Sequence, residues 1–208
     1  MVYFIKLNFL KILLHLFYTA ILLTLIGCQS KLPLDKDLKK RSYSFLNQDS
    51  VVVNFPEIIK DKIIVMGFIY THCPDICPMT THNMVLTEER LIEEGIDDVL
   101  FVALSFDPER DSPEVLRKFA EIRDIKIDNW IFLTGDKTTT EDLLRRFDVK
   151  AIPTDSTFFE DGTNSYSIMH TDRISLINNK GILKQNYKGS IINIEELISD
   201  IKYLGEEK

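Results

Sequence analysis

Two cysteines with three residues between them are the feature of this sequence with the most distinctive chemistry. Cys73 and Cys77 lie in THCPDICPM, residues 71–79, and a proline follows each cysteine. The apolar run of residues 62–70 predicts a strand buried on both faces, and residues 79–94 predict a helix that ends at Gly95. The cysteines would then lie near a helix N-terminus, whose N–H groups and dipole favour the thiolate over the thiol. This position indicates redox or metal chemistry.

The type of metal follows from the ligands that the chain can supply. Thiolates are soft ligands that suit Cu(I), zinc and iron–sulfur centres. A structural zinc site usually takes four protein ligands, and the chain has only one further cysteine, Cys28. This shortage favours copper, with a third ligand from a distant part of the sequence. A disulfide between Cys73 and Cys77, permanent or reversible, is the alternative, because an oxidising compartment would allow it.

Three histidines follow the N-terminal apolar segment: His72, His82 and His170. His72 is adjacent to Cys73, and the side chains of sequence neighbours diverge. At about 3.6 residues per turn, His82 would point away from Cys77 on the predicted helix. His170 comes just before a predicted strand, and in a thioredoxin-like fold the segment that enters this strand faces the cysteine loop. We therefore expect His170 to be the third ligand.

The remaining elements alternate between strands and helices. We expect short strands at 43–46 and 50–55 around a turn at 47–49, a buried strand at 99–106, a helix that starts at Ser112-Pro113-Glu114, a strand at 130–133, a helix at 138–147, a hairpin of 173–177 and 182–187, and a helix at 191–204. This order predicts an α/β domain with a thioredoxin-like fold, in which helices flank a central mixed sheet.

The N-terminus has the pattern of an export signal. Lys6 and Lys11 precede the apolar run of residues 12–26, which is shorter than the ~20 residues that a membrane-spanning helix needs. The run ends in LIGC, residues 25–28, which resembles a bacterial lipobox with Cys28 as the lipid-modified residue. We therefore expect a lipoprotein signal peptide (1–27), a lipid-anchored tether (28–42) and a thioredoxin-like copper-binding domain (43–208). The domain would face the periplasm in the cell envelope.

The charge of the chain excludes one class of partner. The net charge is −7, and it becomes −9 when residues 1–27 are removed with their two lysines. Nucleic-acid binding depends on clustered lysine and arginine side chains. We therefore expect no nucleic-acid partner.

Four segments together carry a family resemblance: GFIYTHCPDICPM, ALSFDPERDSPEVLRKFA, WIFLTGD and MHTDRISLINNKG, in that order. They resemble the Sco/SenC family of copper-binding assembly proteins for cytochrome c oxidase, over residues 45–204. The resemblance implies a thioredoxin-like fold and one copper, as Cu(I), Cu(II) or both, held by Cys73, Cys77 and His170. It also implies delivery to the dinuclear copper site of the oxidase subunit, and a protein that donates copper to this chain.

The sequence departs from the family pattern at two places. Met169 stands where the family usually has aspartate, and strand alternation would point it away from His170, so we expect it to pack. Residues 147–170 contain Ile152-Pro153-Thr154, which is similar to the cis-proline tripeptide of thioredoxins, but we expect them to form an inserted loop. For residues 107–111 we expect a loop cap with an internal arginine–carboxylate pair; the alternative is that the acidic side chains attract a cationic partner or assist a metal.

Two other functions remain open. A thiol–disulfide oxidoreductase could use Cys73 and Cys77 on exported proteins or on the oxidase subunit, and this activity does not exclude copper delivery. A peroxidase is the weaker alternative, because a peroxidatic cysteine needs nearby threonine and arginine, and Thr71 lies on the wrong side of Cys73. Asp75 is too constrained by its flanking prolines to be assigned as a ligand.

Overall fold

The computed structural model describes residues 32–158 and 164–206 of the 208-residue chain. The predicted signal peptide and Cys28 lie outside the described residues. The described residues from Leu34 onward make up one compact unit. Among the described helices, none combines the length and the apolar composition that crossing a membrane requires.

The described residues contain ten strands, four α-helices and three short 3₁₀ helices. The strands are β1 (Lys36–Asp37), β2 (Tyr43–Asn47), β3 (Val52–Phe55), β4 (Ile63–Ile69), β5 (Val99–Ser105), β6 (Trp130–Thr134), β7 (Ala151–Phe158), β8 (Asn164–His170), β9 (Ile174–Ile177) and β10 (Ile182–Tyr187). The helices are α2 (Ile76–Glu93), α3 (Pro113–Ile122), α4 (Lys137–Arg146), α5 (Ile194–Glu206), η1 (Glu57–Ile59), η2 (Ile127–Asn129) and η3 (Gly189–Ile191).

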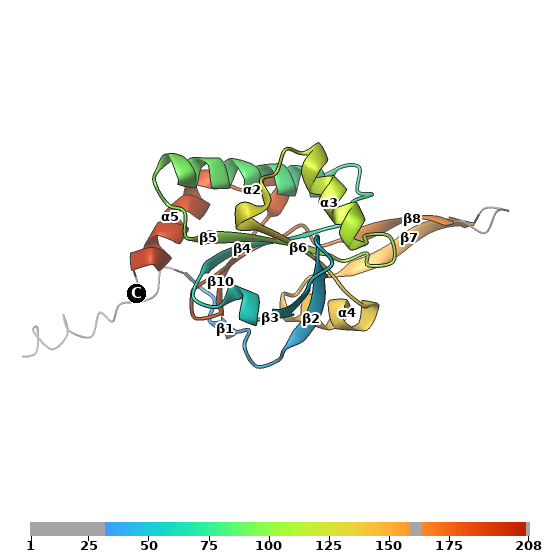
Figure 1. Ribbon diagram of the computed structural model, residues 1–208, viewed down its shortest axis with the longest axis horizontal. Helices are drawn as coiled ribbons and strands as arrows, with labels where there is room; N and C mark the ends of the chain where they lie inside the picture. Colours follow the sequence, from blue (N-terminus) through green and yellow to red (C-terminus); the bar gives the residue numbers. More distant parts are fainter. Residues whose placement is uncertain (1–31, 159–163, 207–208) are drawn as a thin grey trace, which may run out of the picture. The chain divides into compact units, whose positions relative to one another are not determined.

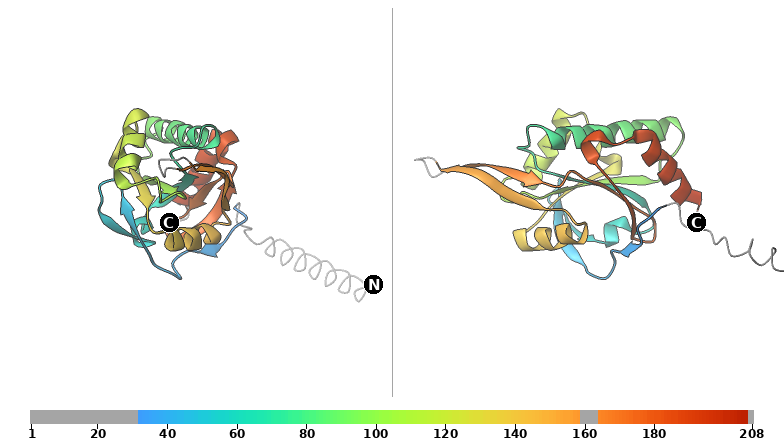
Figure 2. Two further views of the ribbon diagram at one scale, coloured as in Figure 1. Left: turned by 90° about the vertical axis from the view of Figure 1, so that its right-hand side faces the viewer. Right: turned by 180° about the vertical axis from the view of Figure 1, so that it is seen from behind.

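Eight of the strands form one mixed sheet in the order β1-β10-β9-β4-β5-β6-β2-β3. Strands β4, β5 and β6 are parallel, and β9 runs antiparallel to β4. Helices α2, α3 and α5 cover one face of this sheet, and α4 covers the other (Figures 1 and 2). This is the predicted thioredoxin-like α/β architecture.

Burial explains why the central strands lie where they do. Every residue of β4 and β5 is buried, as the continuous apolar runs predict for strands covered on both faces. On β4, a Cβ atom at Gly67 would lie 2.5 Å from the Met84 sulfur of α2, so the glycine lets this helix approach the strand closely. This close packing holds α2 against β4, and residues 70–75 join the C-terminal end of the strand to the first turn of the helix.

The helix ends agree with the predicted capping chemistry. Ser112 accepts a hydrogen bond from the Val115 N–H at the start of α3, and Pro113 is the first helical residue. Gly95 has a φ of 73° directly after α2, a conformation that favours glycine. The first turn of α2 differs from the prediction, because the helix begins at Ile76 and so includes Cys77.

Three other segments differ from the sequence-based expectations. Residues 36 and 37, expected in the tether, pair with β10, and Leu38 is buried, so the folded part begins before Tyr43. The last helix starts at Ile194 instead of 191, after η3.

The expected loop at 147–170 is the largest of these differences. It is a hairpin of β7 and β8, which pair only with each other and project from the domain (Figure 1). Pro153 lies opposite Ile168 in this ladder.

Candidate metal centre

The two cysteines are held by the junction between β4 and α2. Cys73 lies in the loop, where its N–H donates to the Tyr70 carbonyl at 3.3 Å. Cys77 lies in the first turn of α2, and its N–H donates to the Cys73 sulfur at 3.4 Å. The exposed fraction is 9% for Cys73 and 0% for Cys77, and no disulfide joins them. Both sulfurs are therefore largely shielded from water.

His170, the last residue of β8, approaches the two sulfurs from the hairpin. Its Nε2 atom lies 3.6 Å from the Cys77 sulfur and 3.9 Å from the Cys73 sulfur. One ligand atom from each of the three residues falls within 4.8 Å of the others. The structure thus brings together the three residues that the sequence predicts as ligands.

Aromatic rings fix the orientation of the His170 imidazole. Its centroid lies 4.7 Å from the Phe106 ring and 5.8 Å from the Tyr70 ring, which it meets edge-on. His170 is half-buried. The imidazole therefore packs against the two aromatic residues that directly follow β4 and β5.

The two sulfurs differ in their affinity for protons. A hydrogen bond from the Cys77 thiol lowers the pKa of Cys73 to about 4, against the opposing effect of burial. The same hydrogen bond, together with burial, raises the pKa of Cys77 far above its usual value. At neutral pH the metal-free pair therefore holds one proton, on Cys77, and Cys73 is a thiolate.

A buried carboxylate holds the loop that carries Cys73. Asp111 is fully buried and accepts hydrogen bonds from the Thr71 N–H at 3.0 Å and the Thr71 hydroxyl at 2.5 Å. The Ser105 hydroxyl donates to it at 2.6 Å. Burial raises the pKa of Asp111, although these hydrogen bonds act in the opposite direction. Asp111 thus ties the cysteine loop to the end of β5.

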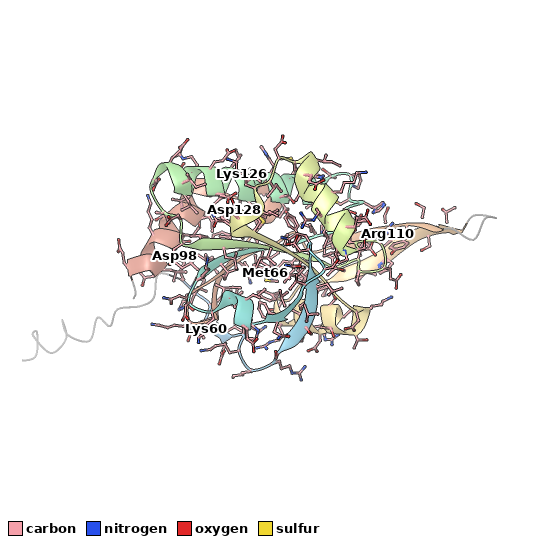
Figure 3. The ribbon with its side chains drawn as sticks, viewed as in Figure 1. Lys60, Met66, Asp98, Arg110, Lys126 and Asp128 are labelled. Atoms are coloured by element: carbon pink, nitrogen blue, oxygen red, sulfur yellow. The ribbon has the colours of Figure 1, made fainter. Side chains whose placement is uncertain are left out.

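Arg110 holds the hairpin strand that carries His170. Its guanidinium lies 3.6 Å from the centroid of the Tyr166 ring on β8 and donates to the Tyr166 carbonyl at 3.0 Å. Arg110 also pairs with Asp107 at 2.5 Å, and the Tyr166 hydroxyl donates to Asp107 at 2.6 Å. Figure 3 shows Arg110 where the hairpin leaves the domain. The predicted arginine–carboxylate pair is confirmed, and it reaches across to β8.

The other candidate residues lie outside this cluster. His72 and His82 are exposed, in agreement with the prediction that neither is a ligand. Asp75 is exposed and makes no side-chain cap to α2. Met169 is 62% exposed, so the prediction that it packs is wrong. Its neighbours in the strand, Ile168 and His170, face the domain, as strand alternation requires.

Three residues around the centre were not singled out from the sequence, Tyr70, Phe106 and Tyr166, and Asp111 was expected only as part of the loop cap at 107–111. Tyr70 and Phe106 directly follow the buried strands β4 and β5, and this position is a signal that could have identified them. Tyr166, Ile168 and His170 alternate along β8, and all three face the domain. This period of two would have identified Tyr166 as a residue that faces the centre if the segment had been recognised as a strand.

The comparison with protein families decides which family the chain belongs to. The SCO1/SenC family model matches residues 33–206. The chain is a member of the SCO1/SenC family. The Bacillus subtilis SCO1 protein homolog is 30% identical over 177 residues, which cover 85% of this chain and 86% of that protein.

Solved structures of SCO1/SenC proteins share the architecture. A SCO1/SenC family lipoprotein from Bacillus anthracis matches with a TM-score of 0.69 and 30% identity, over 84% of this chain and 98% of that one. BsSco matches with a TM-score of 0.68 and 30% identity, over 85% of this chain and 97% of that one. BsSco is described as a member of the Sco family of cytochrome c oxidase assembly proteins, and a disulfide switch was identified in it.

Proposed function

We propose that this SCO1/SenC protein is a membrane-tethered copper chaperone. It binds one copper ion through Cys73, Cys77 and His170 and delivers it to the dinuclear copper site of cytochrome c oxidase during assembly. The observation that carries the proposal is the convergence of two sulfurs and one imidazole nitrogen within 4.8 Å.

The donor atoms support copper as the cargo. Two thiolates and an imidazole suit Cu(I), and thiolate–imidazole sets also hold Cu(II) in electron-transfer sites. The protein supplies three ligands from this cluster, whereas structural zinc is usually held by four. Within the described residues, this cluster is the only group of three or more cysteine, histidine or acidic side chains placed to hold a metal.

The three ligands differ in their exposure to solvent, and this difference suits a protein that transfers its metal to a partner. Cys77 is fully buried, Cys73 is 9% exposed, and His170 is half-buried. A thiolate of an acceptor protein can replace the most accessible ligand first, while Cys77 still holds the ion. A graded exposure of this kind supports transfer through a shared intermediate rather than release into water.

Family membership supports the oxidase as the destination. BsSco, 30% identical, is described as a cytochrome c oxidase assembly protein. The lipobox-like LIGC sequence supports anchoring at Cys28, on the periplasmic side of a membrane. There the domain could reach an oxidase subunit that exposes its copper site.

Delivery can be tested with the soluble copper-site domain of an oxidase subunit. Copper-loaded protein should transfer its ion to the reduced apo-domain, which then develops the absorption of a dinuclear copper centre. Protein with Cys73→Ala should not load and should transfer nothing. If the loaded protein holds its copper indefinitely in the presence of the reduced acceptor, the chaperone proposal is wrong.

A second function, disulfide reduction, is favoured by the low pKa of Cys73. The Cys73 thiolate would attack a substrate disulfide, form a mixed disulfide and expel one substrate thiolate. Cys77, after losing its proton, would attack the Cys73 sulfur and expel the second thiolate, so that two electrons pass to the substrate. The burial and raised pKa of Cys77 make this second attack slow. Copper binding is therefore the better supported function.

A further inference from the structure

A cavity beside the metal centre offers a place for a partner. It has a volume of about 220 Å³ and is bordered by α4, the loop after β5 and the inner face of the β7–β8 hairpin. Phe106, Leu144 and Ile168 line it, and all three are buried. Because β5 and β6 end here, the cavity lies at the carboxyl ends of parallel strands, where α/β proteins commonly bind ligands.

Phe106 separates the cavity from the metal centre. Its ring lines the cavity, and its centroid lies 4.7 Å from the His170 ring. Ala151, also in the cavity wall, is the residue paired with His170 in the β7–β8 ladder. An occupant of the cavity would therefore contact the residues that position His170.

Thr140 of α4 gives the cavity an unpaired polar group. The residue is 1% exposed and lines the cavity. Its hydroxyl has no hydrogen-bond partner among the described residues. A buried hydroxyl without a partner is unfavourable, so an occupant that brings a donor or acceptor to this point would gain a hydrogen bond.

The rim of the cavity is acidic. Glu109 and Glu141 line it together with Lys137, and the Lys137 ammonium lies 3.3 Å from the Glu109 carboxylate. Within the part of the chain that the structure describes, the exposed Glu141 carboxylate has no ion pair. The rim therefore favours an occupant with a positive charge.

We propose that this cavity, termed here the aromatic pocket, binds a tyrosine or tryptophan side chain of the copper-accepting protein, next to a lysine or arginine. This inference rests on the proposed function. A cavity of about 150 Å³ lined by apolar side chains binds benzene, so this volume admits an aromatic ring. The phenol hydroxyl or indole N–H pairs with Thr140, and the neighbouring cation pairs with Glu141. Tyrosine, tryptophan and arginine are the usual anchors of protein interfaces.

Short blocked peptides test the recognition chemistry on the full-length protein in detergent. Ac-Tyr-Arg-NH₂ should bind roughly fivefold more tightly than Ac-Phe-Arg-NH₂, the factor for one neutral hydrogen bond. Backbone amide shifts near Ala151 and Leu144 report the binding. Thr140→Val should remove the preference for tyrosine, and Thr138→Val, on the exposed side of α4, should keep it. A preference that persists in Thr140→Val, or shifts confined to other regions, would overturn the assignment.

The charged rim is tested in the same way. Ac-Tyr-Arg-NH₂ should bind more tightly than Ac-Tyr-Glu-NH₂, and Glu141→Gln should reduce this difference. Glu121→Gln is the matched control, because Glu121 is exposed on α3 and does not line the cavity. Equal affinities for both peptides in the unmodified protein would contradict the role of the rim.

Copper transfer connects the pocket to the proposed function. Thr140→Val and Glu141→Gln should bind copper like the unmodified protein but transfer it severalfold more slowly to a subsaturating oxidase copper-site domain. Unchanged transfer rates would overturn the aromatic pocket and leave the chaperone intact. Absence of copper binding in the unmodified protein would instead overturn the proposed function, whatever the peptides do.

Discussion

At the scale of residues, the chemistry depends on two sulfurs in different environments. Cys73 has a lowered pKa because Cys77 donates a hydrogen bond to it, and Cys77 has a raised pKa for the same reason and because it is buried. The metal-free pair therefore presents one nucleophilic sulfur and one protonated sulfur. Copper binding through both thiolates must displace the remaining proton.

The reactivity of Cys73 tests this difference directly. Its alkylation by iodoacetamide, followed by mass spectrometry, should be nearly independent of pH between about 6 and 8. A thiol with a pKa of about 4 is already deprotonated throughout this range. In Cys77→Ala the hydrogen bond from the thiol is lost, so the pKa of Cys73 should rise and the rate should increase with pH. A rate that rises about tenfold per pH unit in the unmodified protein would contradict the assignment.

Arg110 should affect copper binding without touching the ion. Arg110→Ala removes the contacts that hold Tyr166, so β8 and His170 lose their fixed position. Groups that orient a metal ligand typically contribute about 10–100-fold to metal affinity, and we expect a loss in this range. Competition with a Cu(I) chelator measures it. Arg117→Ala, which removes a surface pair with Asp49, is the control and should bind normally.

At the scale of elements, local sequence patterns were sufficient to predict most of the strands and helices. The continuous apolar runs of β4 and β5, the Ser112 cap and Gly95 each determine a local structure, and these agree with the predictions. The β7–β8 hairpin was missed because it pairs only with itself, outside the main sheet, and so has no continuous apolar run.

The three ligands of the metal centre could be predicted from the sequence, but the residues that hold them in place could not. The spacing of Cys73 and Cys77 indicates a site, and His170 follows from the expected fold. The contacts of Asp111 and Tyr166 could not be predicted locally, because their hydrogen bonds to Thr71 and Asp107 join residues 40 and 59 positions apart.

The contact between α2 and β4 is the element-level feature that places the cysteines. Gly67→Ala should destabilise the protein by about 1–3 kcal/mol in denaturant unfolding, because the new methyl group overlaps the buried Met84 sulfur. Gly205→Ala, on α5, meets no atom within 4 Å and should be neutral or stabilising by about 0.5–1 kcal/mol. Equal free energies of unfolding for the two variants would contradict the close contact between Gly67 of β4 and Met84 of α2.

At the scale of the whole molecule, the proposed function joins an acidic domain to a membrane anchor. The net charge of −7 opposes binding to nucleic acid and suits the basic partner that the aromatic pocket favours. Transfer to an integral membrane oxidase also requires that the protein remain near the membrane, and this role falls to Cys28 in the proposal.

Processing of the N-terminus tests the anchor. Cys28→Ala should leave a precursor with residues 1–27 uncleaved, because the lipobox cysteine is the residue that is modified before cleavage. Mass spectrometry of the membrane fraction distinguishes this precursor from the mature lipoprotein. Recovery of an unlipidated mature form of the unmodified protein, cut at another position, would contradict the prediction.

The most direct test of the central claim is the copper stoichiometry and spectrum of the protein and its histidine variants. The unmodified protein should bind one copper, and its Cu(II) form should show an intense sulfur-to-copper charge-transfer band, which Cys73→Ala and Cys77→Ala abolish. His170→Ala should weaken binding and change the band, whereas His82→Ala, on the exposed side of α2, should bind normally. Wild-type stoichiometry, affinity and spectrum in His170→Ala would contradict the three-ligand site and leave disulfide reduction as the better account.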